Sequence, residues 1–177
     1  MAENKRARPK PQPSPVGEAI WPHLNTPDEY EGSIDFKTKL AMPADAPGVP
    51  ELMNQLDGLV DQAYQETMDD ADVKAVAKKK LVKADPPYEM ELDEDEEETG
   101  RVIFKFKSKG QFKDRKTGQM VDKTLPIFDA KGGKPLKKPP FIRNGSQLVV
   151  SWLPYLWHNH TNKEAGVTMR IAAVQIR

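Results

Sequence analysis

The chain has no cysteine among its 177 residues. A disulfide, a zinc–thiolate site and a thiol nucleophile are therefore all excluded. No apolar run approaches the roughly 18–20 residues that a membrane-spanning helix needs. The N-terminal stretch MAENKRARPKPQPSP also lacks the apolar core of a signal peptide. Together these absences predict a soluble, cytoplasmic protein without a membrane partner.

A recognisable catalytic arrangement is missing as well. The stretch Gly132–Lys134 resembles the end of a P-loop, but Pro135 stands where the magnesium-binding Ser or Thr belongs. No serine lies in a G-x-S-x-G elbow. His158 and His160 could share a metal ion only with further ligands, and their neighbours form a weak set. We therefore expect no enzyme activity, no catalytic residue, no metal and no cofactor.

The net charge of zero conceals a strong asymmetry along the chain. Residues 1–17 carry four Lys or Arg against one acidic residue, and residues 18–100 carry seven against 22. Residues 101–177 carry 16 basic residues against four acidic ones. So basic a C-terminal part is typical of a protein that binds a polyanion. The alternative is that the two parts of the chain simply neutralise each other.

The length suits one ordinary domain with insertions and flexible ends. The basic, proline-rich residues 1–17 predict a disordered arm, and residues 18–177 predict a single domain. Residues 19–32 mix aromatics with turn formers and are expected to wrap around the domain surface. Eight carboxylates between Glu89 and Glu98 repel one another and predict a mobile acidic loop at about residues 89–99.

The apolar periodicity predicts a mainly β fold. Residues 33–43 alternate as a half-buried strand does, whereas spacings of three and four then predict a helical insertion at about residues 49–83. Four further strands are expected over residues 100–114, 120–130, 146–153 and 166–177. This content is that of a five-stranded antiparallel OB-type barrel with a helical insertion after the first strand. On pattern alone, a small β-sandwich remains an alternative.

The strand near residue 105 alternates Lys with Phe in the stretch FKFKSK. If Phe104 and Phe106 face the core, the lysines project from the other face about every 7 Å, close to the phosphate spacing of an extended single strand. A solvated face usually mixes charge signs, so we favour polyanion binding over a face that only maintains solubility. The candidate phosphate ligands are Lys105, Lys107, Lys109, Lys113, Arg115, Lys116 and Lys123.

Aromatic residues indicate which polyanion this is. Single-stranded nucleic acid is held by a cationic groove together with rings on which unpaired bases stack. Tyr155 and Trp157 lie two residues apart in a stretch interpreted as a polar loop, residues 153–166, and are predicted to be exposed stacking platforms. Trp152 continues an alternating apolar row and is expected in the core. The pattern does not assign Trp21.

Four motifs occur in order: FKFKSKGQFKDRKTGQ, PIFDAKGGK, NGSQLVVSWLPYLWHN and AGVTMRIAAVQI. In sequence and spacing they resemble the single-stranded-DNA-binding protein family of T-seven-type podoviruses, closely over about residues 100–177 and more weakly over about 18–99. The resemblance implies an OB fold and sequence-independent binding of single-stranded DNA in phage replication, recombination and repair, in the cytoplasm of the infected bacterial host. It also implies DNA contacts by Tyr155, with Trp157 beside it, and by the lysines of the Lys/Phe strand.

Members of that family extend into an acidic C-terminal tail that supports a homodimer and contacts the phage DNA polymerase and helicase-primase. The printed sequence ends at Arg177, at the end of the last expected strand, so these partners depend on a tail that it does not show. We hypothesise that the internal acidic residues 91–98 compete with DNA for the groove. The alternatives are an RNA-binding OB module and a non-enzymatic phage component that binds other proteins.

Overall fold

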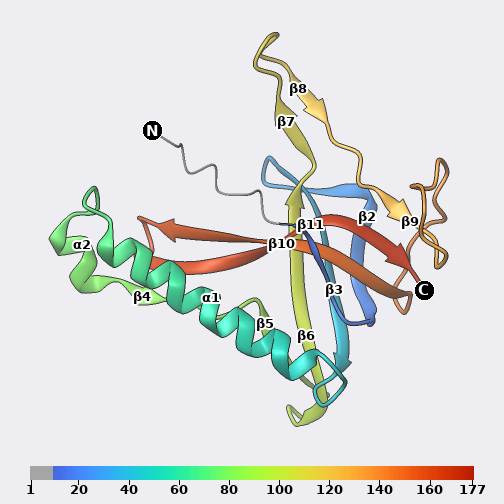
Figure 1. Ribbon diagram of the computed structural model, residues 1–177, viewed down its shortest axis with the longest axis horizontal. Helices are drawn as coiled ribbons and strands as arrows, with labels where there is room; N and C mark the ends of the chain where they lie inside the picture. Colours follow the sequence, from blue (N-terminus) through green and yellow to red (C-terminus); the bar gives the residue numbers. More distant parts are fainter. Residues whose placement is uncertain (1–9) are drawn as a thin grey trace.

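Five long strands close into a barrel in the computed structural model, which describes residues 10–177 (Figure 1). The strands pair in the order β10, β2, β3, β6 and β11, and β11 pairs again with β10. Their bounds are Gly17–Tyr30 for β2, Ser33–Pro43 for β3, Glu98–Lys109 for β6, Gln147–Asn159 for β10 and Glu164–Ile176 for β11. The predicted OB-type barrel with a helical insertion is confirmed. One pairing differs from the expectation, because β6 and β11 are parallel.

The structure assigns one barrel strand differently from the sequence pattern. Residues expected to wrap around the surface form β2, which pairs with β3. Its alternation is hard to recognise because Pro22 and Pro27 lie within it and its register shifts on either side of His23. The expected strand 120–130 forms only the short strands β8 (Met120–Asp122) and β9 (Ile127–Phe128). The helical insertion therefore follows the second barrel strand instead of the first.

The expected disordered arm is partly ordered. Residues 1–9 of this arm lie outside the described residues, whereas β1 (Gln12–Pro13) pairs with β10. Ser14 is buried, its backbone N–H donates to the carbonyl of Val150, and its hydroxyl accepts from the N–H of Val150. These hydrogen bonds hold the second half of the arm on the barrel, where disorder was predicted.

Helix α1 (Val49–Asp69) forms where the spacing predicts it and packs against β10 and β11. Pro50 and Glu51 lie in its first turn, where proline and a negative charge are both favoured. Helix α2 (Ala75–Lys80) is short and ends in three lysines. No helix within residues 10–177 has the length and apolarity to cross a membrane. The buried face of α1 consists of Val49, Leu52, Leu56, Val60, Ala63 and Thr67.

The barrel core contains the apolar side chains of all five long strands. Phe104 and Phe106 of β6 are buried, as the alternation predicts, and Trp152 of β10 is fully buried among them. Burial of large side chains at this density contributes about 1.5–3 kcal/mol for each one. The core therefore fixes which face of β6 points outward.

The acidic segment forms a hairpin, so the prediction of a mobile loop over residues 89–99 is corrected. Strand β5 (Tyr88–Leu92) pairs antiparallel with β6. Asp93 organises the turn, because its Oδ1 accepts from the backbone N–H groups of Asp95 and Glu97. At the other end, the Tyr88 hydroxyl donates to Asp57 of α1 at 2.7 Å. Burial and this hydrogen bond raise the pKa of Tyr88 to about 12.

Arg101 joins this hairpin to β2. Its Nε and Nη2 donate to the two carboxylate oxygens of Glu91 at 2.8 and 2.7 Å, and its Nη1 donates to Glu18 at 2.7 Å. The bidentate hydrogen bonding from Arg101 holds the pKa of Glu91 below its ordinary value. Arg101 thus neutralises Glu91, one of the carboxylates whose mutual repulsion was expected to keep this segment mobile.

We predict that Glu91→Gln destabilises the protein at pH 7 by about 1 kcal/mol, because a partly exposed bidentate ion pair is lost. The stabilisation from Glu91 is present above the ordinary Glu pKa of about 4.3 and is lost as the pH falls through the lowered folded value. Thermal unfolding at pH 7 and pH 3 measures this, and the gap between variant and wild type should narrow in acid.

Glu94→Gln is the matched control, because Glu94 is exposed in the turn of the same hairpin and forms no ion pair with a described residue. An equal loss of stability in both variants at pH 7 would contradict a specific role for the Arg101 cluster.

Candidate nucleic-acid interface

The outer face of β3 and β6 carries lysines that lie directly opposite one another. In the antiparallel register Lys37 pairs with Lys107, and Lys39 pairs with Lys105. Lys109 lies opposite Asp35. Like charges directly across two strands repel, so this arrangement does not favour the sheet by itself. It concentrates positive charge in two neighbouring Lys–Lys pairs of the barrel wall.

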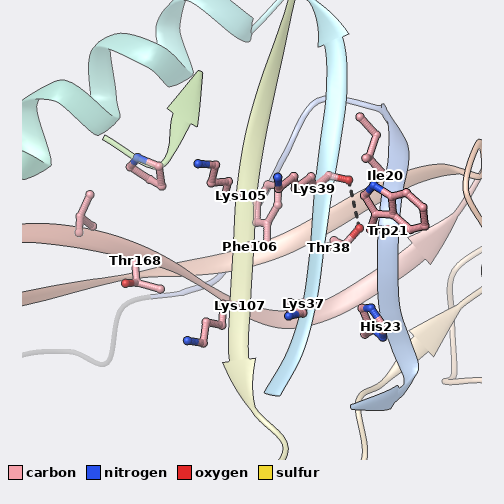
Figure 2. A pocket seen from close by; sticks show the side chains of 12 residues that line it. Ile20, Trp21, His23, Lys37, Thr38, Lys39, Lys105, Phe106, Lys107 and Thr168 are labelled. Atoms are coloured by element: carbon pink, nitrogen blue, oxygen red, sulfur yellow. Dashed lines mark hydrogen bonds between the residues drawn. The ribbon is translucent and has the colours of Figure 1, made fainter. Parts of the chain in front are cut away.

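A groove of about 540 Å³ runs over this face (Figure 2). Figure 2 shows that lysines reach it from β3 and β6, while Trp21 and His23 border it from β2 and Thr168 lies toward β11. The groove therefore carries four lysines from two strands and has an exposed aromatic ring at one border. Its lining includes Trp21, His23, Lys37, Lys39, Lys105 and Lys107.

Carboxylates accompany some of these lysines. The hydrogen bond from Lys37 holds the pKa of Asp28 below its ordinary value. Lys39 and Lys109 form no ion pair with a described residue, so they are available to an anionic ligand. The other three lysines pair with carboxylates, and each would exchange its carboxylate for a phosphate when an anionic strand binds. The ion pairs are Lys37–Asp28 at 2.6 Å, Lys107–Asp35 at 3.7 Å and Lys105–Glu89 at 3.7 Å.

Tyr155 lies on a strand, where the sequence predicted a loop. β10 continues to Asn159, and Tyr155 pairs with Thr168 of β11. The ring is 44% exposed, and the guanidinium carbon of Arg170 lies 3.5 Å from its centroid. Tyr155, Lys107, Lys109 and Arg170 line a second hollow of about 190 Å³. The structure thus brings one predicted ring together with two predicted lysines.

Trp157 lies on the same face of β10, two residues nearer the tip of the β10–β11 hairpin. It is half-buried and pairs with Gly166. A Cβ atom at Gly166 would lie 2.6 Å from Cζ2 of Trp157 and 2.9 Å from the Ala84 Cβ, so glycine lets the indole pack flat on the neighbouring strand. Trp157 lines neither the groove nor the Tyr155 hollow.

The remaining predicted basic residues separate into two groups. Lys123 joins Lys109 around a hollow of about 170 Å³. Lys113, Arg115 and Lys116 are exposed on the hairpin of β7 (Gln111–Lys113) and β8, which projects from the barrel (Figure 1). These three residues do not line the groove.

Sequence reasoning missed several residues of this surface. Lys37 and Lys39 alternate with apolar residues in the first expected strand, so the sequence indicates that they share a face. It does not indicate that β6 lies beside that face. Arg170 follows the same alternation in the last strand. Trp21 gave no usable signal, because its position depends on the irregular strand β2.

The two histidines of the hairpin tip lie edge to face, with ring centroids 4.2 Å apart. Within residues 10–177, no three His, Asp or Glu side chains converge closely enough to hold a metal ion.

Comparisons with known proteins agree with this architecture. A family model described as "Single-stranded DNA-binding protein, Bacteriophage T7" matches residues 23–176. The single-stranded DNA-binding protein of Escherichia phage T7 is 27% identical over 143 residues, which are 80% of this chain and 60% of that protein. The chain therefore spans about 60% of the length of this curated relative.

Solved structures show the same fold. The crystal structure of gp2.5, a single-stranded DNA-binding protein encoded by bacteriophage T7, has a TM-score of 0.77 at 22% identity and covers 96% of this chain and 92% of its own. The single-stranded DNA-binding protein from bacteriophage Enc34, solved in complex with single-stranded DNA, has a TM-score of 0.60 at 15% identity. That similarity covers 93% of this chain and 84% of the Enc34 chain.

We predict that Lys39→Gln stabilises the protein by a few tenths of a kcal/mol at low salt, because it removes the repulsion between Lys39 and Lys105. Chemical denaturation at about 20 mM and 1 M salt measures the effect, which should vanish at high salt because screening removes the repulsion. Lys109→Gln is the control, since Lys109 faces Asp35 and should give no gain. A gain that persists at 1 M salt would contradict an electrostatic origin.

Proposed function

This chain belongs to the family of the bacteriophage T7 single-stranded DNA-binding protein, and on that premise we propose that it binds single-stranded DNA without sequence preference. We further propose that it is not an enzyme and acts in phage DNA replication, recombination and repair, in the cytoplasm of the infected bacterium. The observation that carries the proposal is the lysine-lined groove of β3 and β6, with the exposed ring of Trp21 at its border and the exposed ring of Tyr155 in a second hollow that shares Lys107 with it.

The groove suits a strand whose bases are unpaired. Lysines spaced along a strand can follow successive phosphates, while an exposed ring offers a stacking surface to any base. Tyr155 supplies such a surface beside Lys107 and Lys109. Arg170 covers one side of this ring, so a base would stack on the other. The proposed contacts then require no recognition of individual base edges.

A homodimer and contacts with the phage DNA polymerase and helicase-primase are part of this proposal through family membership alone. Single-stranded DNA is the partner that the groove itself supports. The Enc34 protein with a similar fold was solved with single-stranded DNA, which adds support for a nucleic-acid ligand on this type of barrel.

A titration with oligo-dT tests the function directly. Among the three tryptophans, Trp21 is exposed and Trp157 half-buried, so bound bases should quench the intrinsic fluorescence. Binding should weaken with salt by about −0.7 in log–log slope for each phosphate contact. Competition with an oligoribonucleotide of equal length separates DNA binding from the RNA-binding alternative. A fluorescence signal that oligo-dT leaves unchanged at low salt would contradict the proposal.

Two substitutions should separate stacking from charge. Tyr155→Ala is expected to weaken binding about 5- to 150-fold with little change in the salt slope, because stacking contributes about 1–3 kcal/mol per base. Tyr155→Phe keeps the ring and should bind nearly as the wild type does. Lys107→Ala should flatten the slope by about 0.7.

Lys79→Ala removes an exposed lysine of α2 that lines no part of the groove, and it controls for the loss of charge alone. If Lys79→Ala flattened the slope as much as Lys107→Ala does, the groove would not be the binding surface.

A further inference from the structure

Trp21 combines exposure with backbone strain. Its side chain is 70% exposed, and its φ of 48° lies in the left-handed region that bulky residues rarely adopt. Such a conformation costs on the order of 1–3 kcal/mol and persists only where the surroundings enforce it. An exposed indole gains no core packing in return. Strain at an exposed aromatic residue therefore suggests a role in binding.

A β-bulge produces this conformation. Ile20 pairs with Lys39 and His23 pairs with Lys37, so Trp21 and Pro22 together lie opposite the single residue Thr38. A bulge bends its strand and directs a side chain away from the regular pleat. Asn144 adds a tether, because its Oδ1 accepts the backbone N–H of Trp21. The indole is thus held at the border of the groove (Figure 2).

A second exposed ring lies near Trp21 on a segment from elsewhere in the chain. Phe141 is 69% exposed, whereas the adjacent Ile142 is buried in the core. Asn25 of β2 fixes this segment, since its side chain donates to the carbonyl of Pro140 at 3.0 Å and accepts the Ile142 N–H at 2.8 Å. The outward position of Phe141 is therefore anchored on both sides.

Trp21 and Phe141 border a hollow of about 330 Å³, which is separate from the lysine groove but shares Trp21 and His23 with it. The guanidinium carbon of Arg143 lies 6.0 Å from the centroid of the Phe141 ring. Among residues 10–177, no carboxylate lines this hollow. Two rings, one cation and continuity with a lysine groove match the chemistry of unpaired nucleotides.

We propose that Trp21 and Phe141 form a second base-stacking subsite, in which Arg143 contacts a phosphate of the same single strand. The subsite rests on the proposed function and extends it. The strand leaves the lysine groove past Trp21 and continues over β2 to Phe141. The bound length is then greater than the groove alone can hold, and the additional nucleotides contact residues on the side of β2 away from Tyr155.

The double variant Trp21→Gly, Phe141→Ala tests the subsite. Glycine removes the indole and also relieves the positive φ, and Phe141 is too exposed to support the core, so the fold should be retained. Binding is measured with oligo-dT from about 4 to about 16 nucleotides, the range of site sizes for one OB fold. The shortest oligomers that bind should bind as they do to wild type. The longest should bind about tenfold more weakly.

Leu92→Ala is the matched control. Leu92 is also an exposed apolar residue, but it lies on the acidic hairpin and lines neither the lysine groove nor the hollow of Trp21 and Phe141. Oligomers that carry 5-iododeoxyuridine give a direct readout. Ultraviolet light should cross-link them to Trp21 or Phe141, as identified by mass spectrometry, and only when the oligomer is long.

The subsite would be overturned if affinity depended on oligomer length equally in the wild type and the double variant and if neither ring were cross-linked. The proposed function would survive that result, provided that Tyr155→Ala still weakened the binding of oligomers of every length. A wild-type protein that bound no oligo-dT would overturn the proposed function and the subsite together.

Discussion

The two-residue alternation of β6 is the constraint on which the surface of this protein depends. Phe104 and Phe106 are buried in the barrel, and β6 is paired with β3 on one side and with β5 and β11 on the other. A slip of one residue would turn lysines into the core, which costs far more than any surface contact could return. Core packing therefore holds Lys105 and Lys107 outward at strand spacing, whether or not a ligand is bound.

That rigidity has an electrostatic consequence. The same register places Lys39 opposite Lys105 and Lys37 opposite Lys107. Lysines on flexible loops could move apart, but lysines on paired strands cannot. Ion pairs of Lys37, Lys105 and Lys107 with nearby carboxylates offset part of this repulsion, and the barrel core supplies stability elsewhere. Functional surfaces commonly keep such locally unfavourable arrangements. A ligand that carries regularly spaced negative charges relieves the repulsion. Relief of a repulsion that is already present in the unbound protein therefore contributes to the binding free energy.

The elements that could be predicted are those whose buried face repeats regularly in the local sequence. α1 shows its apolar residues every three or four positions, and β6 shows Val102, Phe104 and Phe106 at every second one. β2 escapes prediction because its bulge and two prolines interrupt the alternation, so its identity as a strand depends on partners. Tyr155 was recognised by its chemistry but placed in a loop, since the polar residues that follow hide the extension of β10. The tether between Trp21 and Asn144 spans 123 residues and leaves no local trace.

The lysines and the exposed aromatic rings of this surface are positioned by different features of the fold. Lysines that must face outward in a regular pleat are positioned by strands β3 and β6, and they suit the regular repeat of phosphates. Rings that must meet bases need individual orientations, and the two rings obtain these in different ways. Tyr155 stacks on Arg170 within a regularly paired part of the β10–β11 hairpin, whereas Trp21 projects from a bulge. A bulge also lets β2 bend without breaking the barrel. The lysines of the regular strands thus supply sequence-independent attraction, and the exposed rings of Tyr155 and Trp21 supply the surfaces on which unpaired bases can stack.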